Sequence, residues 1–225
     1  MIRIAYLSLL IAAPSLAQTA DPAPAPPAPP PATVRVQLTT AAGPIVVAVE
    51  TERAKVTAAN FLRYVDQKRL DGGAFYRAMK ITPDGTYGLI QGGVQDGKKL
   101  LPPIAHEPTT KTGLSHIDGA ISMARAAPGS AQAQFFITIG ALTSLDADPK
   151  AAGDNLGFAV FGRVVEGMET VKKILEAPVS PTAGEGAMKG QMIAAPVKIV
   201  SAKRLPNLPP PAVLPPAPPQ PAPAQ

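Results

Sequence analysis

The chain has 225 residues, enough for one domain with a full hydrophobic core or for two small ones. Its formal net charge is +5, but lysine and arginine occur singly or in pairs rather than in a dense stripe, which argues against a nucleic-acid-binding protein. The sequence contains no cysteine, which excludes disulfides, thiol nucleophiles and thiolate metal sites together.

Proline is concentrated toward the two ends of the chain. Of the 28 prolines, seven lie within 22–31 and ten within 206–223. Segments so rich in proline lack the N–H donors that a helix or a sheet needs, so we expect them to be extended and solvated. The sequence therefore predicts one folded domain at 33–205, preceded by a Pro/Ala-rich linker at 18–32 and followed by a disordered Pro-rich tail at 206–225.

The first residues resemble a secretory leader. Arg3 supplies a positive charge, positions 4–13 form an apolar run, and small residues stand at 15 and 17. We expect a signal peptide at 1–17, cleaved after Ala17, and a periplasmic or otherwise exported protein. The apolar run is about half as long as a bilayer-spanning helix, which argues against stable membrane insertion. A buried N-terminal strand is the alternative interpretation.

Hydrophobic periodicity predicts the elements of the folded part in chain order. Apolar residues alternate with polar ones at 34–38, and Ile45, Val47 and Val49 resume the alternation after a turn, which indicates a half-buried β-hairpin. Positions within 58–65 follow helical spacing, and a second amphipathic helix follows Gly167. The remaining short apolar segments are typical of strands: 74–79, 87–90, 120–124, 135–139, 158–164 and 197–202. Such strands with two distant helices do not alternate as βαβ units, so an antiparallel sheet or closed barrel is expected.

A series of short motifs stands in an order known from one protein family. These are Phe75-Tyr76-Arg77, Ile90-Gln91-Gly92-Gly93, Ser122-Met123-Ala124-Arg125-Ala126, Gln134-Phe135-Phe136-Ile137, Ser144-Leu145-Asp146 and Phe158-Ala159-Val160-Phe161-Gly162. In this order the chain resembles the cyclophilins over nearly all of 33–205, as an exported bacterial member. The resemblance implies a mostly β, closed eight-stranded antiparallel barrel capped by two α-helices. It also implies a peptidyl-prolyl cis-trans isomerase with its groove on the outer wall.

The chemistry of that reaction limits what a site must contain. The peptide bond resists rotation by ~18–20 kcal/mol, because the nitrogen lone pair is delocalised into the carbonyl. No covalent bond breaks, so no nucleophile, metal or cofactor is needed. A donor must be aimed at the prolyl nitrogen, where the lone pair localises as the bond twists, and an apolar slot must hold the ring. Two or three charge-assisted hydrogen bonds of ~1.5–3 kcal/mol each, made only at the twisted geometry, supply the acceleration.

The resemblance assigns roles to particular residues. Arg77 is expected to donate to the prolyl nitrogen, Gln91 to bond the substrate backbone, and Phe136 to form the floor of the proline slot. The other expected substrate-binding residues form the walls and the groove: Leu89, Met123, Ala124, Arg125, Gln134, Leu145 and Phe158. For Arg77 alone, an ordinary place on the barrel surface is the alternative, and for Met123 a core position and a pocket position stay open.

The chain departs from the family pattern at three places. Between the arginine and glutamine motifs it is longer, with an inserted turn at 82–85, so the position of the usual pocket aromatic is open between Gly88 and Tyr87. Ser144 stands where many eukaryotic members have tryptophan, and Phe158 stands where a histidine is common. We expect activity to survive these changes with an altered substrate preference. The loop at 147–157 is longer than a tight turn needs, and its role is open.

The two histidines do not indicate a metal site. His106 has only the adjacent Glu107 as a nearby carboxylate in sequence, which is not the spacing of zinc ligands. His116 precedes a turn into a strand, and Asp146 is expected to form a turn rather than to act as an acid. We expect structural or surface roles for both histidines, and no metal or cofactor.

Three functional classes remain in competition. The first is a monomeric isomerase acting on proline-containing segments of unfolded or partly folded exported proteins, with no nucleic-acid partner. The second is a chaperone or scaffold module of the same fold that binds proline peptides with little or no turnover. The third is a structural envelope protein tethered by its proline-rich ends. The presence of Arg77, Gln91 and Phe136 favours the first class, because binding alone does not require an arginine at the prolyl nitrogen.

Overall fold

The computed structural model describes residues 32–206. The predicted leader at 1–17 lies outside the described residues. So do the linker and the tail, except for residues 32 and 206 themselves.

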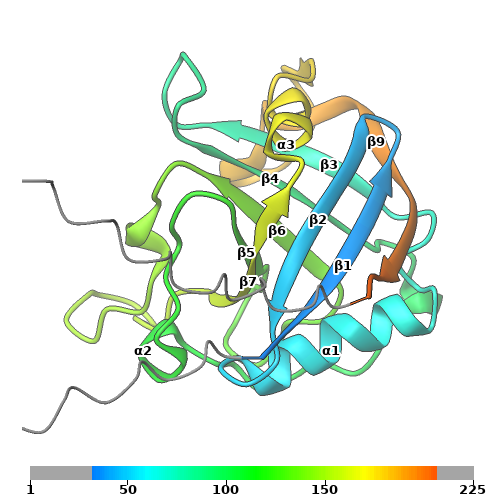
Figure 1. Cartoon of the computed structure of the whole chain (residues 1–225). Helices are drawn as coiled ribbons and strands as arrows, with labels where there is room; N and C mark the ends of the chain where they lie inside the picture. Colours follow the sequence, from blue (N-terminus) through cyan, green and yellow to red (C-terminus); the bar gives the residue numbers. More distant parts are fainter. Residues whose placement is uncertain (1–31, 207–225) are drawn as a thin grey trace, which may run out of the picture. The chain divides into compact units, whose positions relative to one another are not determined.

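Eight antiparallel strands form a closed barrel (Figure 1). They are β1 (Thr33–Thr40), β2 (Gly43–Glu50), β3 (Ala74–Lys80), β4 (Gly88–Gly93), β5 (Ala120–Met123), β6 (Gln134–Ile139), β7 (Ala159–Glu166) and β9 (Met192–Arg204). The order around the sheet is β1-β2-β7-β5-β6-β4-β3-β9, and β9 pairs with β1 to close it. The two-residue strand β8 (Val179–Ser180) pairs with β9 outside this ring. The predicted barrel is confirmed.

Two longer helices cover the ends of the barrel, as predicted. Helix α1 (Lys55–Asp66) contacts β9, β7 and β2, whereas α3 (Met168–Leu175) contacts β2, β3, β4 and β6, and Figure 1 shows them at opposite ends. A four-residue helix, α2 (Thr109–Thr112), and the 3-10 turns η1 (Gly97–Lys99), η2 (Thr143–Leu145) and η3 (Gly186–Met188) lie in loops. Within 32–206, every helix is too short or too polar to span a bilayer.

Aromatic side chains fill the inside of the barrel. The ring of Phe61 on α1 packs against Phe135 at 5.7 Å and Phe161 at 5.0 Å between centroids, and Phe75 packs edge-on against Phe135 at 5.8 Å. All four rings are at most 2% exposed. Each aromatic pair adds ~0.5–1.5 kcal/mol beyond the burial of its area. Because the interior is packed with side chains, a binding site on this domain has to be built on its outer wall.

The inserted turn predicted at 82–85 is present in the β3–β4 connection. The amide of Gly85 donates to the carbonyl of Thr82 at 3.0 Å, and Gly85 has a φ of +72°, which favours glycine. The Asp84 carboxylate accepts hydrogen bonds from the amide and the hydroxyl of Thr86. These hydrogen bonds lower the pKa of Asp84 to about 2.

Candidate active site

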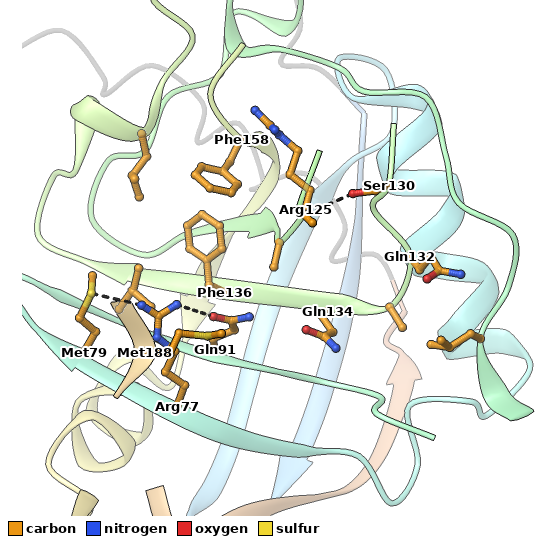
Figure 2. A pocket seen from close by; sticks show the side chains of 16 residues that line it. Arg77, Met79, Gln91, Arg125, Ser130, Gln132, Gln134, Phe136, Phe158 and Met188 are labelled. Atoms are coloured by element: carbon orange, nitrogen blue, oxygen red, sulfur yellow. Dashed lines mark hydrogen bonds between the residues drawn. The ribbon is translucent and has the colours of Figure 1, made fainter. Parts of the chain in front are cut away.

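A cavity of about 600 Å³ lies on the outer wall of the barrel, over β3, β4 and β6 (Figure 2). Its lining includes all of the predicted site residues except Met123: Arg77, Leu89, Gln91, Ala124, Arg125, Gln134, Phe136, Leu145 and Phe158. Residues that the sequence did not single out complete it: Met79, Leu100, Ala126, Ser130, Gln132, Ala133 and Met188. The structure therefore brings together residues that are spread over more than a hundred positions of the chain.

Strand alternation places the cavity side chains. On β4, Leu89 and Gln91 line the cavity, while Ile90 between them belongs to the barrel core. On β6, Phe136 lines the cavity, while its neighbour Phe135 is fully buried in the core. Successive side chains of a strand point to opposite faces, so the strands that enclose the core also build the site.

A β-bulge in β3 turns Arg77 toward the cavity. The pairing of β3 with β4 shifts between Phe75, which pairs with Gly92, and Arg77, which pairs with Gln91. The extra residue, Tyr76, lets both Tyr76 and Arg77 face outward, whereas uninterrupted alternation from the buried Phe75 would direct Arg77 into the core. This local irregularity is what makes the arginine available to a ligand.

The Arg77 guanidinium is held by three side chains. Its Nη1 donates to Oε1 of Gln91 at 2.8 Å, and its Nε and Nη2 both donate to Oε1 of Gln191, at 2.8 and 2.7 Å. Nη2 also lies 3.5 Å from the sulfur of Met79, and Figure 2 draws the contacts to Gln91 and Met79. Burial lowers the pKa of Arg77, but an arginine stays charged in a protein.

A row of polar side chains continues from Arg77 along the cavity. Gln91 donates from Nε2 to the hydroxyl of Tyr76 at 2.9 Å, and this hydroxyl donates to Oε1 of Gln134 at 2.7 Å. Burial raises the pKa of Tyr76, so it keeps the proton that it donates. Tyr76 and Gln191 were not predicted. Tyr76 stands inside a quoted motif, but Gln191 lies in a Gly- and Pro-rich loop where no sequence pattern marks it.

The floor of the cavity, Phe136, packs between two other rings. The ring of Phe136 lies parallel to that of His116, within 8° and at 5.7 Å between centroids, and meets Phe158 edge-on at 5.4 Å. The guanidinium of Arg125 lies over Phe158, 5.3 Å from its centroid. Phe136 is therefore supported from two sides, and Figure 2 shows the Phe136–Phe158 part of this arrangement.

His116 supports the floor from a fully buried position. Its Nδ1 pairs with the carboxylate of Asp146, and its Nε2 lies 3.0 Å from the hydroxyl of Ser122. Burial lowers the pKa of His116, and the Asp146 carboxylate opposes this effect without reversing it. The set resembles the relay of a serine hydrolase, but Ser122 is 0% exposed, so no substrate can reach its hydroxyl. The arrangement is a support for Phe136.

Met123 lies away from the cavity. It is 2% exposed and packs in the barrel core, because Ser122 next to it takes the outward position on β5. Of the two positions left open for Met123, the structure shows the core.

No aromatic side chain enters the cavity from position 87 or 88. Tyr87 is 42% exposed and lies beside Gly140, where an added Cβ would come within 2.5 Å of its ring. A Cβ on Gly88 would point toward Leu175 of α3. Met79 from β3 and Met188 from η3 form part of the cavity wall. Thioether side chains adapt to irregular shapes, so this wall is softer than an aromatic one.

The side chain of Arg125 holds the 147–157 loop. It makes two hydrogen bonds to the Asp154 carboxylate, at 2.8 and 2.9 Å, and two to the carbonyl of Gly157, at 2.9 and 2.6 Å. These hydrogen bonds lower the pKa of Asp154 to about 2. Arg125 lines the cavity as predicted, but its charge is already paired with the loop at the rim.

Comparisons with known proteins agree with this arrangement. The family described as "Cyclophilin type peptidyl-prolyl cis-trans isomerase/CLD" matches residues 35–204. Peptidyl-prolyl cis-trans isomerase A of Dickeya dadantii is 34% identical over 176 residues, covering 76% of this chain and 80% of that protein. A peptidyl-prolyl cis-trans isomerase of Acinetobacter baylyi is 34% identical over 175 residues, covering 76% of this chain and 85% of that protein.

A solved structure shares the fold. It is a cyclophilin-type peptidyl-prolyl cis-trans isomerase of Cryptosporidium parvum, determined in the presence of the dipeptide Ala-Pro. Its TM-score is 0.61 at 21% identity, with 77% of this chain and 99% of that chain covered. Together the comparisons confirm the resemblance drawn from the motifs and the predicted isomerase class. The roles of individual residues stay predictions.

Proposed function

Because the chain belongs to the cyclophilin-type peptidyl-prolyl cis-trans isomerase family, we propose that its outer-wall cavity catalyses rotation about X-Pro bonds with Arg77 as the donor to the prolyl nitrogen. One observation carries this proposal: the charged guanidinium of Arg77 on β3 and the apolar floor of Phe136 on β6 line the same cavity, and Gln91 on the strand between them, β4, bonds Arg77 and pairs with Phe136.

The cavity divides into an apolar and a polar part. Phe136, Leu89 and Leu145 pack together and offer the pyrrolidine ring an apolar slot. As the bond twists, the nitrogen loses its conjugation and becomes an acceptor for a guanidinium N–H. This bond exists only near the transition state, so it lowers the barrier without tightening the ground state. The amides of Gln91 and Gln134 hold the backbone on either side of the proline.

The substrates that we propose are proline-containing segments of unfolded or partly folded exported proteins. The leader-like residues at 1–17 support the export of the chain, and we propose that it is a bacterial protein that works as a monomer. Mass spectrometry of the protein recovered from a periplasmic fraction tests this. A mature chain that begins at Gln18 is the expected result, and an uncleaved chain in the cytosolic fraction would contradict it.

The test of the activity is an isomerisation assay on short X-Pro peptides with the wild type and Arg77→Ala. We expect kcat/KM to fall about a hundredfold or more, which corresponds to a rise of about 2.7 kcal/mol in the activation free energy. Arg63→Ala is the matched control, because Arg63 is an exposed arginine on α1. A wild type that binds proline peptides without turnover would instead favour the chaperone or scaffold module.

A further inference from the structure

The loop before β9 folds back onto the strand that carries Arg77. Its last residue, Gln191, accepts the amide of Ala78 with its own carbonyl at 2.9 Å, and its amide donates to the carbonyl of Met188 at 3.1 Å. Ala78 follows Arg77 directly on β3, and Arg77 itself pairs with Met192. The main chain therefore places Gln191 against the catalytic arginine of the proposed function.

The side-chain amide of Gln191 has a defined direction. Its Nε2 donates to the carbonyl of Ala187 at 2.8 Å, which leaves Oε1 to face Arg77. This single oxygen accepts from both Nε and Nη2 of the guanidinium. A shared acceptor along one edge fixes the guanidinium plane, because a rotation of that plane about the Cδ–Nε bond would break at least one of the two hydrogen bonds.

The remaining donors of Arg77 can be counted. A guanidinium has five N–H groups. Gln191 takes one from Nε and one from Nη2, the sulfur of Met79 takes the second from Nη2, and Gln91 takes one from Nη1. One N–H on Nη1 is left, and Arg77 lines the cavity.

All three acceptors around Arg77 are uncharged. Two are amide oxygens and one is a thioether, and within 32–206 none of the ion pairs includes Arg77. The other arginine of the cavity, Arg125, is neutralised by Asp154. The same cavity thus contains one arginine whose charge is paired and one whose charge is available to a ligand.

We propose that Gln191 is a positioning residue for Arg77, which orients the guanidinium while leaving its positive charge uncompensated. This inference rests on the proposed function. A carboxylate at this place would also accept from the guanidinium, but it would cancel the field that stabilises the lone pair at the twisted nitrogen. The neutral amide provides orientation without that loss.

Two variants separate orientation from charge. Gln191→Ala removes the shared acceptor. Gln191→Glu keeps an acceptor of the same size and adds a negative charge, although it also loses the hydrogen bond to the carbonyl of Ala187. We expect kcat to fall about tenfold or more in both, as the loss of one charge-assisted interaction predicts, with peptide Kd changed less than about threefold. Lys189→Gln is the control, because it makes the same change in net charge at an exposed residue of the same loop.

The NMR signal of the Arg77 Nε–H gives a readout that a general loss of stability would not move. It should be slow to exchange with solvent in the wild type and in Gln191→Glu, and fast in Gln191→Ala. Thermal unfolding shows whether each variant folds. If Gln191→Ala does not fold, the kcat of the isosteric Gln191→Glu alone tests the inference. Wild-type kcat in Gln191→Glu would overturn the inference. If Arg77→Ala also keeps wild-type kcat, the proposed role of Arg77 is wrong, and the inference on Gln191 falls with it.

Discussion

The rings of His116 and Phe136 lie parallel, with planes within 8° and centroids 5.7 Å apart, and Phe136 is the floor of the cavity. The imidazole is 0% exposed, and both of its nitrogens have polar partners. A fully bonded, buried ring cannot turn aside, so Phe136 rests on a rigid support. The aromatic floor is therefore preorganised before any peptide binds.

The burial of His116 predicts how stability depends on pH. Burial lowers the pKa of His116, whereas an unfolded histidine titrates near about 6.5. The unfolded chain therefore binds the proton more readily, so the free energy of unfolding is highest above about pH 6.5 and falls as the pH drops below it. Urea unfolding between pH 8 and 5 measures this. His116→Gln should flatten the profile relative to the wild type and to His106→Gln, and an unchanged profile would contradict the expectation.

The pairing of Arg125 with Asp154 predicts the mobility of the 147–157 loop. Asp154→Asn should increase amide hydrogen exchange in this loop by about two- to fivefold, the range expected for an exposed ion pair. Since the pKa of Asp154 is about 2, the wild-type loop should keep its protection until the pH falls toward that value. Asp148→Asn is the control, because Asp148 bonds the amide of Lys150 and does not touch Arg125. Equal exchange in both variants would refute the pairing.

Phe136, the floor of the cavity, is predicted to contribute to kcat/KM as well as to stability. Phe136→Leu removes two ring contacts, at a cost of about 1–3 kcal/mol in the free energy of unfolding. It should also lower kcat/KM about tenfold, because the proline ring loses its flat support. Phe161→Leu is the matched control, since Phe161 lies in the barrel core. If Phe161→Leu lowers kcat/KM as much, Phe136 has no special role.

The hydroxyl of Tyr76 joins two amides of the cavity, which makes Tyr76→Phe informative. Without the hydroxyl, Gln91 loses an acceptor and Gln134 loses a donor. We expect kcat/KM to fall about three- to tenfold, the equivalent of one neutral hydrogen bond. Tyr87→Phe should leave the rate unchanged, because Tyr87 does not line the cavity. Equal rates in the wild type and Tyr76→Phe would mean that the hydroxyl does not order the amides.

The fold could be predicted because its signals are local. Alternation along β1 and helical spacing along α1 depend on neighbours in sequence, and burial followed both patterns. The half-buried hairpin was wrong for β2, which is buried on both faces from Ile45 to Glu50. The bulge at Tyr76 is harder to predict from the sequence, because it inserts one extra residue and so reverses which of the following side chains face outward. A motif match places Met123 near the pocket in sequence, but only the register of β5 shows that it points inward.

The parts of the site that escaped prediction come from distant segments. Gln191 is 114 residues from Arg77, and it reaches the arginine through the pairing of β9 with β3. Met188 enters the cavity wall from the same loop. No periodicity or composition marks these two residues, because their positions depend on closure of the barrel and not on local propensity.

The most direct test of the central claim separates binding from catalysis in Arg77→Ala. Exchange NMR on one X-Pro peptide gives both the rate of isomerisation in the bound state and the Kd. If the guanidinium acts on the twisted nitrogen, the bound-state rate should fall about a hundredfold or more while the Kd stays within about threefold. A bound-state rate equal to that of the wild type, with the whole defect in the Kd, would contradict the account.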